Sequence, residues 1–428
     1  MTTGDPAELS ADDARILGLE STAVTGHTLK LLILEPAAQP LDLETLRRTV
    51  AQRLPAQPRA TQLVDTSASV PRWVEANAFD IRDHVRRVPD SDGISGPDLW
   101  RIVGGLMSEH LDRSRPLWTF DVIGPLADGR EAIAARIHHA MADGIAGVQF
   151  LSEVLLDIQP DVPSQNPAPR GSDALSLPAE VRRLPGAAFR ELGGPGSPSP
   201  FDLEISAARE LAFTVVPLAA MKAIGKSRPN PATVNDVLLA IIAGGLRKWL
   251  PADDSRKRHL RAQVPVSLHH REHGGAASAN QDSFMNVDLP LAEADPLVRL
   301  DLISAETRTR KAHGDPAVLY DLFHALGRYK PIGSALQHLA DSAREFALAI
   351  SNVPGPRNTV GVGTRRVLEL FSSSEPGAHH ALRISAISCG TDIGIGLCTD
   401  PNALPGVAGL AEAIDDSFTE LHTAASAD

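Results

Sequence analysis

Apolar residues recur along the chain with two different periods, and the two alternate. Short runs of consecutive apolar residues are typical of buried strands, whereas apolar residues spaced three and four apart are typical of helices. Up to residue 156 these patterns predict strands at 29–35, 118–123 and 132–137, and helices at 43–54, 99–111 and 145–156. From residue 202 onward they predict strands at 260–266, 284–289, 346–351, 382–388 and 393–397, and helices at 233–250, 297–311 and 407–421. Each half therefore holds enough strands and helices for a layered unit, so we predict the α/β class with α+β-type layers.

The segment between the two halves has a different composition. Residues 157–201 are rich in Pro, Gly and Ser, and residues 193–200 read Gly-Gly-Pro-Gly-Ser-Pro-Ser-Pro. Such a composition does not favour regular structure. The sequence therefore predicts an N-terminal domain over 1–156, a crossover linker over 157–201 that runs across the surface, and a C-terminal domain over 202–428.

Composition and charge narrow the classes of protein to consider. The formal net charge of −12 argues against a nucleic-acid partner, because phosphate binding needs a basic surface. No apolar run approaches the ~20 residues of a membrane-spanning helix, and the first residues lack the basic and apolar parts of a signal peptide, so we expect a cytoplasmic protein. The two cysteines, Cys389 and Cys398, show neither a disulfide framework nor a zinc-ligand pattern.

One segment leaves open the possibility that the protein binds a membrane surface. Residues 211–228 combine apolar residues with Lys222, Lys226 and Arg228, as a helix on an anionic membrane surface would. Pro217 interrupts a continuous helix, and the same spacing favours a helix packed in the core. We therefore expect a core helix here, with a helix peripheral to a membrane or lipid-droplet surface as the alternative.

The chemistry concentrates in residues 138–144, which read His-His-Ala-Met-Ala-Asp-Gly between a predicted strand and a predicted helix. Strand ends that face a crevice are where α/β folds usually place their chemistry, and histidine is the side chain whose pKa suits a general base near neutral pH. Asp143 can cap the following helix, and Gly144 permits a tight turn. We predict that His138, His139, Asp143 and Gly144 form a catalytic segment.

Two further histidine pairs, His269–His270 and His379–His380, raise the alternative of a metal site. Adjacent side chains point in divergent directions, none of the pairs has the i, i+4 spacing of a helical zinc motif, and few carboxylates are nearby in the sequence. We therefore expect no metal and no bound cofactor.

The pattern His138-His139-x-x-x-Asp143-Gly144 resembles the motif of the acyltransferase superfamily that includes chloramphenicol acetyltransferase and peptide synthetase condensation domains. Four other segments resemble motifs of one branch, the bacterial wax ester synthase/diacylglycerol acyltransferases, in that family's order: 116–118, 234–240, 264–267 and 351–356. This resemblance covers nearly the whole chain. It implies two chloramphenicol acetyltransferase-like domains with a tunnel between them, which the histidine motif faces from the N-terminal half.

The resemblance also implies a reaction, the transfer of an acyl group from acyl-CoA to a long-chain alcohol or diacylglycerol. Acyl transfer needs a base for the hydroxyl proton and donors for the developing oxyanion, but no metal and no cofactor beyond acyl-CoA as co-substrate. The family's base is the second histidine, which assigns that role to His139 and a supporting role to His138. Asp143 is implied to pair with an arginine that usually follows the motif at 264–267. Here the first arginine after that motif is Arg271, so either Arg271 reaches back to Asp143 or Asp143 has another partner.

Five residues outside the histidine motif are candidates for binding substrate: Asn235, Asp236, Ser351, Asn352 and Trp118. The first two open a helix whose amide end favours negative charge, but helix capping explains them equally well. A sharp turn at Pro354-Gly-Pro explains the next two equally well. Trp118 is expected to pack in the core near the motif.

The choice of substrate stays open on sequence alone. Residues 388–392 and 9–20 depart from the family's usual segments. The leading interpretation is synthesis of wax ester or triacylglycerol; the alternatives are an acyltransferase that takes its acyl group from a carrier protein or CoA and acts on a specialised alcohol, and an inactive lipid-binding relative. The aliphatic character of 145–156, 237–242 and 393–397 predicts an aliphatic tunnel and long acyl chains, because each methylene moved from water contributes up to ~0.8 kcal/mol.

Overall fold

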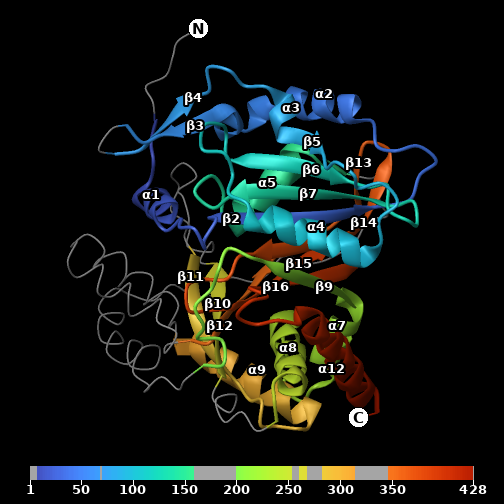
Figure 1. Cartoon of the computed structure of the whole chain (residues 1–428). Helices are drawn as coiled ribbons and strands as arrows, with labels where there is room; N and C mark the ends of the chain where they lie inside the picture. Colours follow the sequence, from blue (N-terminus) through green and yellow to red (C-terminus); the bar gives the residue numbers. More distant parts are fainter. Residues whose placement is uncertain are drawn as a thin grey trace.

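The computed structural model describes residues 7–67, 70–158, 199–252, 260–267, 282–313 and 346–427. These residues form two layered halves, each built on a large sheet, with one half above the other in Figure 1. No helix in the described ranges is both long and apolar enough to cross a bilayer.

The sheet of the first half has seven strands. Their order is β5 (Val85–Arg87), β6 (Trp118–Ile123), β7 (Glu131–His138), β2 (His27–Leu34), β14 (Arg365–Ser374), β13 (Val360–Val362) and β8 (Asp157–Ile158). Every residue of β2, β6 and β7 is buried, because both faces of these strands are covered. One face carries α2 (Leu43–Arg53), α3 (Ile81–His84) and α5 (Gly144–Val154), and the other carries α4 (Gly96–Ser108) (Figure 1).

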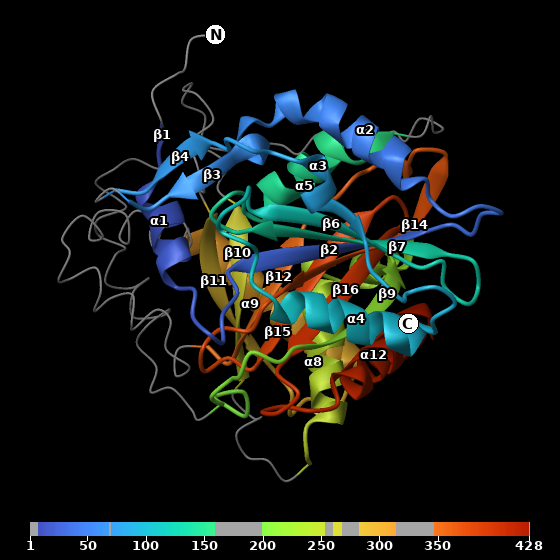
Figure 2. The same cartoon turned by 45° about the horizontal axis from the view of Figure 1, so that its top comes forward.

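A small sheet completes the outer side of this half. It consists of β1 (Ala7–Glu8), β4 (Arg72–Glu75) and β3 (Gln62–Asp65). In the chain, α1 (Ala11–Gly18) follows β1, and two short 3-10 turns at Leu54–Ala56 and Pro58–Thr61 precede β3. Figure 2 shows this sheet beside α1 and next to α3.

The sheet of the second half has six strands. Their order is β11 (Asp282–Leu289), β10 (Leu260–Ser267), β12 (Leu348–Val353), β15 (Leu382–Cys389), β16 (Asp392–Thr399) and β9 (Glu210–Pro217). Its helices are α7 (Leu218–Ser227), α8 (Val234–Trp249), α9 (Pro296–His313) and α12 (Val407–Ala427). The central helix α8 is buried along most of its length, because α7, α9 and α12 all pack against it (Figure 1).

Most of the predicted elements are confirmed, but the helix expected over 211–228 is wrong. Residues up to Pro217 form β9, which pairs with β16, and only the residues after it form a helix, α7. A proline lacks the N–H that a helix interior requires, so a boundary at Pro217 is physically sensible. The segment therefore supports neither a single core helix nor a continuous helix on a membrane surface.

Strand β14 ties the two halves together. It follows β12 and β13 in the chain and leads into β15, yet it pairs with β2 of the first sheet, where Ser372 lies opposite Lys30. Residues 360–374 thus belong to the first sheet, although the sequence placed them in a C-terminal domain over 202–428. Of the predicted linker over 157–201, all but its first two and last three residues lie outside the described part of the chain.

Candidate functional site

The histidine motif lies where β7 ends and α5 begins, and backbone hydrogen bonds hold it there. The amide of His139 donates to the carbonyl of Gly26 at 2.9 Å. Asp143 is the N-cap of α5, and its Oδ1 accepts a hydrogen bond from the amide of Ala146 at 2.7 Å. The predicted capping role of Asp143 is therefore confirmed. The arginine proposed as its partner, Arg271, lies outside the described residues.

His138 is buried, and the protein uses both of its ring nitrogens. The amide of Ala140 donates to Nδ1 at 3.0 Å, so the proton of the neutral ring resides on Nε2. Nε2 in turn donates to Oε1 of Glu20 at 2.5 Å, and Arg113 donates to the other oxygen of that carboxylate. These contacts leave His138 no free nitrogen for substrate and suit a supporting role in fixing the loop.

His139 differs from its neighbour in both respects. Its side chain is half-buried, and no residue in the described part of the chain hydrogen bonds to its ring nitrogens. The pKa of His139 is lowered to about 3. Burial is the largest cause, and the positive charges of Arg383 and Lys30 act in the same direction. The ring is therefore neutral at pH 7 and has a lone pair available to accept a proton.

The lowered pKa predicts how pH affects stability. The pKa of His139 is about 3 in the folded protein and 6.5 when unperturbed, so between these values the unfolded chain binds the extra proton. The contribution of the neutral His139 ring to the free energy of unfolding is fully present above pH 6.5 and is lost as pH falls towards 3. Between pH 7 and pH 5, we expect the Tm of His139→Ala to fall by less than the Tm of wild type.

The matched control is His422→Ala, because His422 is exposed on α12. This variant should follow the wild-type Tm profile. His27 is also buried with a pKa far below its usual value, so some acid sensitivity should persist in every variant. If His139→Ala and wild type lost Tm equally, the ring of His139 would titrate normally in the folded protein.

Gly144 makes a close approach to the second half of the molecule. Its backbone is not in the left-handed region. A Cβ at this position would lie 3.1 Å from Cγ2 of Val353 on β12. The start of α5 therefore packs against the second half of the molecule, which places the histidine motif at the seam between the halves.

Two of the predicted binding residues contact one another across elements. Nδ2 of Asn352, in β12, donates to Oδ1 of Asn235, at the start of α8, at 3.4 Å. Ser351 donates to the hydroxyl of Ser385 on β15 at 3.1 Å. All of these side chains except that of Ser385 are only partly buried. Asn235 and Asn352, two candidates from separate sequence motifs 117 positions apart, thus meet in the folded protein.

Asp236 and Trp118 have structural roles instead of the substrate-binding role predicted for them. The buried carboxylate of Asp236 accepts hydrogen bonds from Thr233, in a reciprocal cap of α8, and from Thr307 at 2.7 Å. Trp118 is fully buried, donates to the carbonyl of Ala60 at 2.9 Å and stacks on His84. Neither side chain is available to a substrate.

Sequence reasoning missed two cations near His139. Lys30 on β2 is 1% exposed, its Nζ donates to Ser372 at 2.8 Å, and burial lowers its pKa to about 8. Burial also lowers the pKa of Arg383 on β15. A lysine within the otherwise apolar run Leu29-Lys-Leu-Leu-Ile-Leu was the one signal available in the sequence.

The predicted aliphatic tunnel is not built from the segments expected to line it. The apolar residues of 237–242 and 393–397 are fully buried in the core of the second half. Most of those of α5 are buried against the first sheet. These side chains stabilise the fold and do not line a space beside His139.

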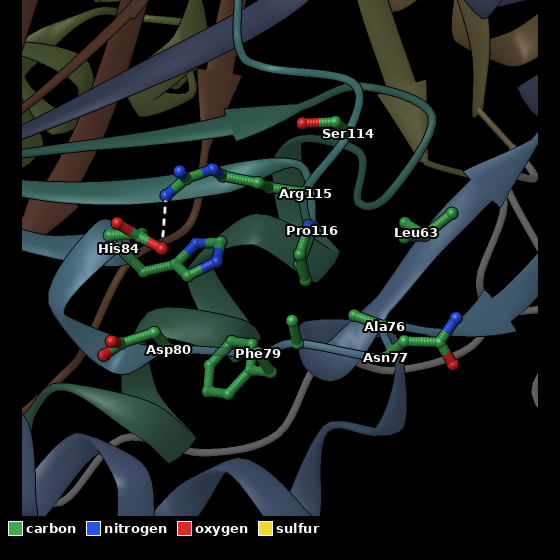
Figure 3. Close-up of a pocket in the computed structure, with 11 residues that line it drawn as sticks. Leu63, Ala76, Asn77, Phe79, Asp80, His84, Ser114, Arg115 and Pro116 are labelled. Carbon is green, nitrogen blue, oxygen red and sulfur yellow. Dashed lines mark ion pairs between the residues drawn. The ribbon is translucent and has the colours of Figure 1, made fainter.

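A separate cavity lies in the first half. Figure 3 shows it between Ala76–Asp80 and the loop Ser114–Pro116, with His84 at its wall and an ion pair between Arg115 and Asp83 beside it. Nδ1 of His84 lies 2.8 Å from the carbonyl of Trp118, so the ring is anchored to β6. His139 is not among the lining residues.

The remaining histidine pair has divergent contacts. His379 is exposed and lies 3.2 Å from Asp202, whereas His380 is buried and stacks on Phe346. Within the described ranges, no group of three or more His, Cys, Asp and Glu side chains could hold a metal ion. The pair His269–His270 lies outside those ranges.

Comparison with known proteins agrees with this geometry. The model of the wax ester synthase/diacylglycerol acyltransferase catalytic domain matches residues 9–195, and the model of the C-terminal domain of the same family matches residues 278–422. A probable diacylglycerol O-acyltransferase of Mycobacterium tuberculosis, tgs1, is 29% identical over 98% of this chain and 95% of its own. A putative diacylglycerol O-acyltransferase of the same organism is 29% identical over 84% of this chain and 78% of its own.

Solved structures confirm the expected two-domain, chloramphenicol acetyltransferase-like fold. The wax ester synthase/diacylglycerol acyltransferase of Marinobacter aquaeolei superposes with a TM-score of 0.74 at 21% identity and covers 98% of this chain and 100% of its own. The first condensation domain of the CDA synthetase gives a TM-score of 0.61 at 15% identity and covers 99% and 97%. The chain belongs to the wax ester synthase/diacylglycerol acyltransferase family, and it is an acyltransferase.

Proposed function

We propose that this enzyme transfers an acyl group from acyl-CoA to the hydroxyl of a lipophilic alcohol or diacylglycerol, with His139 as the general base. The observation that carries this proposal is the state of His139: a neutral ring, held by its backbone at the seam between the halves, whose nitrogens bind no described residue. The names of the similar mycobacterial proteins support diacylglycerol as an acceptor.

In the proposed reaction, His139 accepts the hydroxyl proton as the alcohol oxygen attacks the thioester carbonyl carbon. The new C–O bond gives a tetrahedral oxyanion, for which Asn235 is the candidate donor, since its oxygen already accepts from Asn352. The C–S bond then breaks, and the departing thiolate takes the proton from His139. The products are an ester and free CoA, and a positioned base of this kind is commonly worth ~10²- to 10⁴-fold in rate.

The arrangement of the halves supports an entry route for both substrates along the seam, which is the tunnel implied by family resemblance. Lipophilic acceptors also suggest that the protein works in the cytoplasm in contact with a membrane or lipid-droplet surface, because such substrates partition into lipid. We include this peripheral contact in the proposal.

Incubation of the purified protein with labelled palmitoyl-CoA and a panel of alcohols, including hexadecanol and a diacylglycerol, tests the proposal. We expect free CoA and an ester in equal amounts by mass spectrometry, and a kcat/KM that rises by orders of magnitude from acetyl-CoA to palmitoyl-CoA. Release of free fatty acid alone would contradict the proposal. Transfer from an acylated carrier protein but not from CoA would instead favour a specialised alcohol as the acceptor.

A further inference from the structure

The main chain of His139 is held by a short loop before β2, residues 21–26. The amide of His139 donates to the carbonyl of Gly26 at 2.9 Å, and Gly26 has φ of 75°, in the left-handed region. A glycine loses more conformational freedom on folding than any other residue, so a glycine at this point needs contacts from elsewhere to hold it. Those contacts decide where the carbonyl that binds His139 lies.

Glu375 supplies such contacts from a distant part of the chain. It follows the last residue of β14, and its carboxylate accepts three hydrogen bonds from the loop. Oε1 accepts from the amide of Gly26 at 2.5 Å, and Oε2 accepts from the amide and the hydroxyl of Thr25 at 2.6 and 3.0 Å. Thr25 and Gly26 are both buried, so water has little access to these groups. Hydrogen bonds to an ionised group are roughly twice as strong as neutral ones, so Glu375 holds the loop firmly.

Arg209 holds the same loop at a second point. Its buried guanidinium donates to the carbonyl of Ala23 and, at 2.5 Å, to the carbonyl of Ser206 before β9. Its positive charge also favours the ionised form of the Glu375 carboxyl. Two residues of opposite charge from beyond position 202 thus fix a loop that belongs to the N-terminal part of the chain.

We propose that Glu375 is a positioning residue for His139: its carboxylate fixes Thr25 and Gly26, and the carbonyl of Gly26 in turn fixes the main chain of His139. This inference rests on the proposed function, because it serves the base named there. Both oxygens of Glu375 are engaged by the loop, so we assign it no contact with substrate. Since no described residue hydrogen bonds to the ring of His139, the alignment of that ring depends on its main chain and its packing.

The first test is Glu375→Gln. A glutamine side chain has one oxygen that accepts and an NH2 group that would face a second backbone N–H, so at least one hydrogen bond to the loop is lost. We expect kcat with palmitoyl-CoA and hexadecanol to fall by on the order of 10- to 100-fold, because a misplaced catalytic group costs rate even when the change lies outside the reacting atoms. KM for palmitoyl-CoA should stay near the wild-type value, and Glu375→Asp, which keeps both oxygens, should recover part of kcat.

The matched control is Glu35→Gln, at the opposite end of the same pair of strands. Oε1 of Glu35 accepts a hydrogen bond from the amide of Arg366 on β14 at 3.0 Å, so this carboxylate also holds a backbone amide. Glu35→Gln should keep the wild-type kcat. Equal falls of kcat in Glu35→Gln and Glu375→Gln would reduce the effect to a general weakening of the β2–β14 pair and overturn the inference.

A double-mutant cycle separates positioning of His139 from a general loss of stability. If Glu375 acts through His139, then Glu375→Gln should cause no further loss of rate in the His139→Ala background. Its fall in Tm should be the same in both backgrounds, because the hydrogen bonds to Thr25 and Gly26 are lost in each. A further loss of rate in the His139→Ala background would show that Glu375 acts by another route and would contradict the inference.

Hydrogen exchange distinguishes failure of this inference from failure of the proposed function. If wild type transferred no acyl group, or if His139→Ala did not slow transfer, the proposed function would be wrong. Faster exchange at the amides of Gly26 and His139 in Glu375→Gln, but not in Glu35→Gln, would still support the positioning role. Unchanged exchange at both amides would overturn it.

A second variant covers the case in which Glu375→Gln does not fold. Thr25→Val removes one of the three hydrogen bonds to the Glu375 carboxylate and leaves the two from backbone amides. We expect a fall in kcat that is smaller than the one predicted for Glu375→Gln, together with faster exchange at the amide of His139. Wild-type values of both quantities in Thr25→Val would count against the inference.

Discussion

Replacing His139 with alanine should lower kcat/KM for acyl transfer by on the order of 10²- to 10⁴-fold, the range that a positioned general base supplies. The substitution removes the ring whose nitrogens bind no described residue, whereas the amide of His139 keeps its hydrogen bond to Gly26. We therefore expect Tm at pH 7.5 to change little. The measurements are initial rates with palmitoyl-CoA and thermal unfolding of the same preparations.

Two further histidine variants give the prediction its specificity. His138→Ala should lose less activity than His139→Ala but more stability, because it empties a fully buried position and removes the donor to Oε1 of the half-buried Glu20. His422→Ala should match wild type in both measurements. Comparable rates in wild type and a folded His139→Ala variant would exclude His139 as the base.

Gly26→Ala should damage both stability and activity. Gly26 has φ of 75°, in the left-handed region, and a Cβ there would overlap Nε2 of His138. The left-handed backbone costs ~1–2 kcal/mol for alanine, and overpacking typically adds ~1–3 kcal/mol. Displacement of His138 would also disturb the loop that carries His139, so we expect a lower Tm together with a lower kcat.

Gly93→Ala is the matched control for this prediction. Gly93 has φ of 69°, nearly the same backbone, but a Cβ there would meet nothing within 4 Å. Gly93→Ala should therefore lose only the free energy of placing alanine in a left-handed backbone, so we expect a smaller fall in Tm and no loss of activity. Equal losses of Tm in the two variants would mean that contact with His138 contributes nothing, and our account of the loop would be wrong.

The parts of the fold that could be predicted from the sequence are those with strong local patterns. The segments of β7, α5 and α8 combine periodic apolar residues with capping side chains, and the chain folds there as local rules require. The prediction for residues 211–217 was wrong because their apolar spacing fits a helix as well as a strand, and pairing with β16 decides between the two. Strand β14 was missed because its Arg, Glu and Ser residues obscure the apolar pattern.

The candidate site divides in the same way. His139 and Asp143 could be found because a strand, a turn and a helix that are adjacent in the sequence hold them. Glu20, Lys30, Glu375 and Arg383 could not, because their roles depend on contacts between distant segments: Glu20 reaches His138 across 118 positions, and Glu375 reaches Gly26 across 349. No spacing rule connects residues that meet only when two sheets assemble.

The place of β14 in the first sheet has a consequence for how this protein is made. During synthesis, β2 leaves the ribosome long before residues 365–374, the strand that pairs with it, have been translated. The first half therefore cannot complete its sheet as an independent unit, and β2 presents an open edge until most of the chain has been translated. Open edges of this kind template association with other chains. The nascent protein must therefore be protected, by its own residual collapse or by chaperones, over most of its elongation.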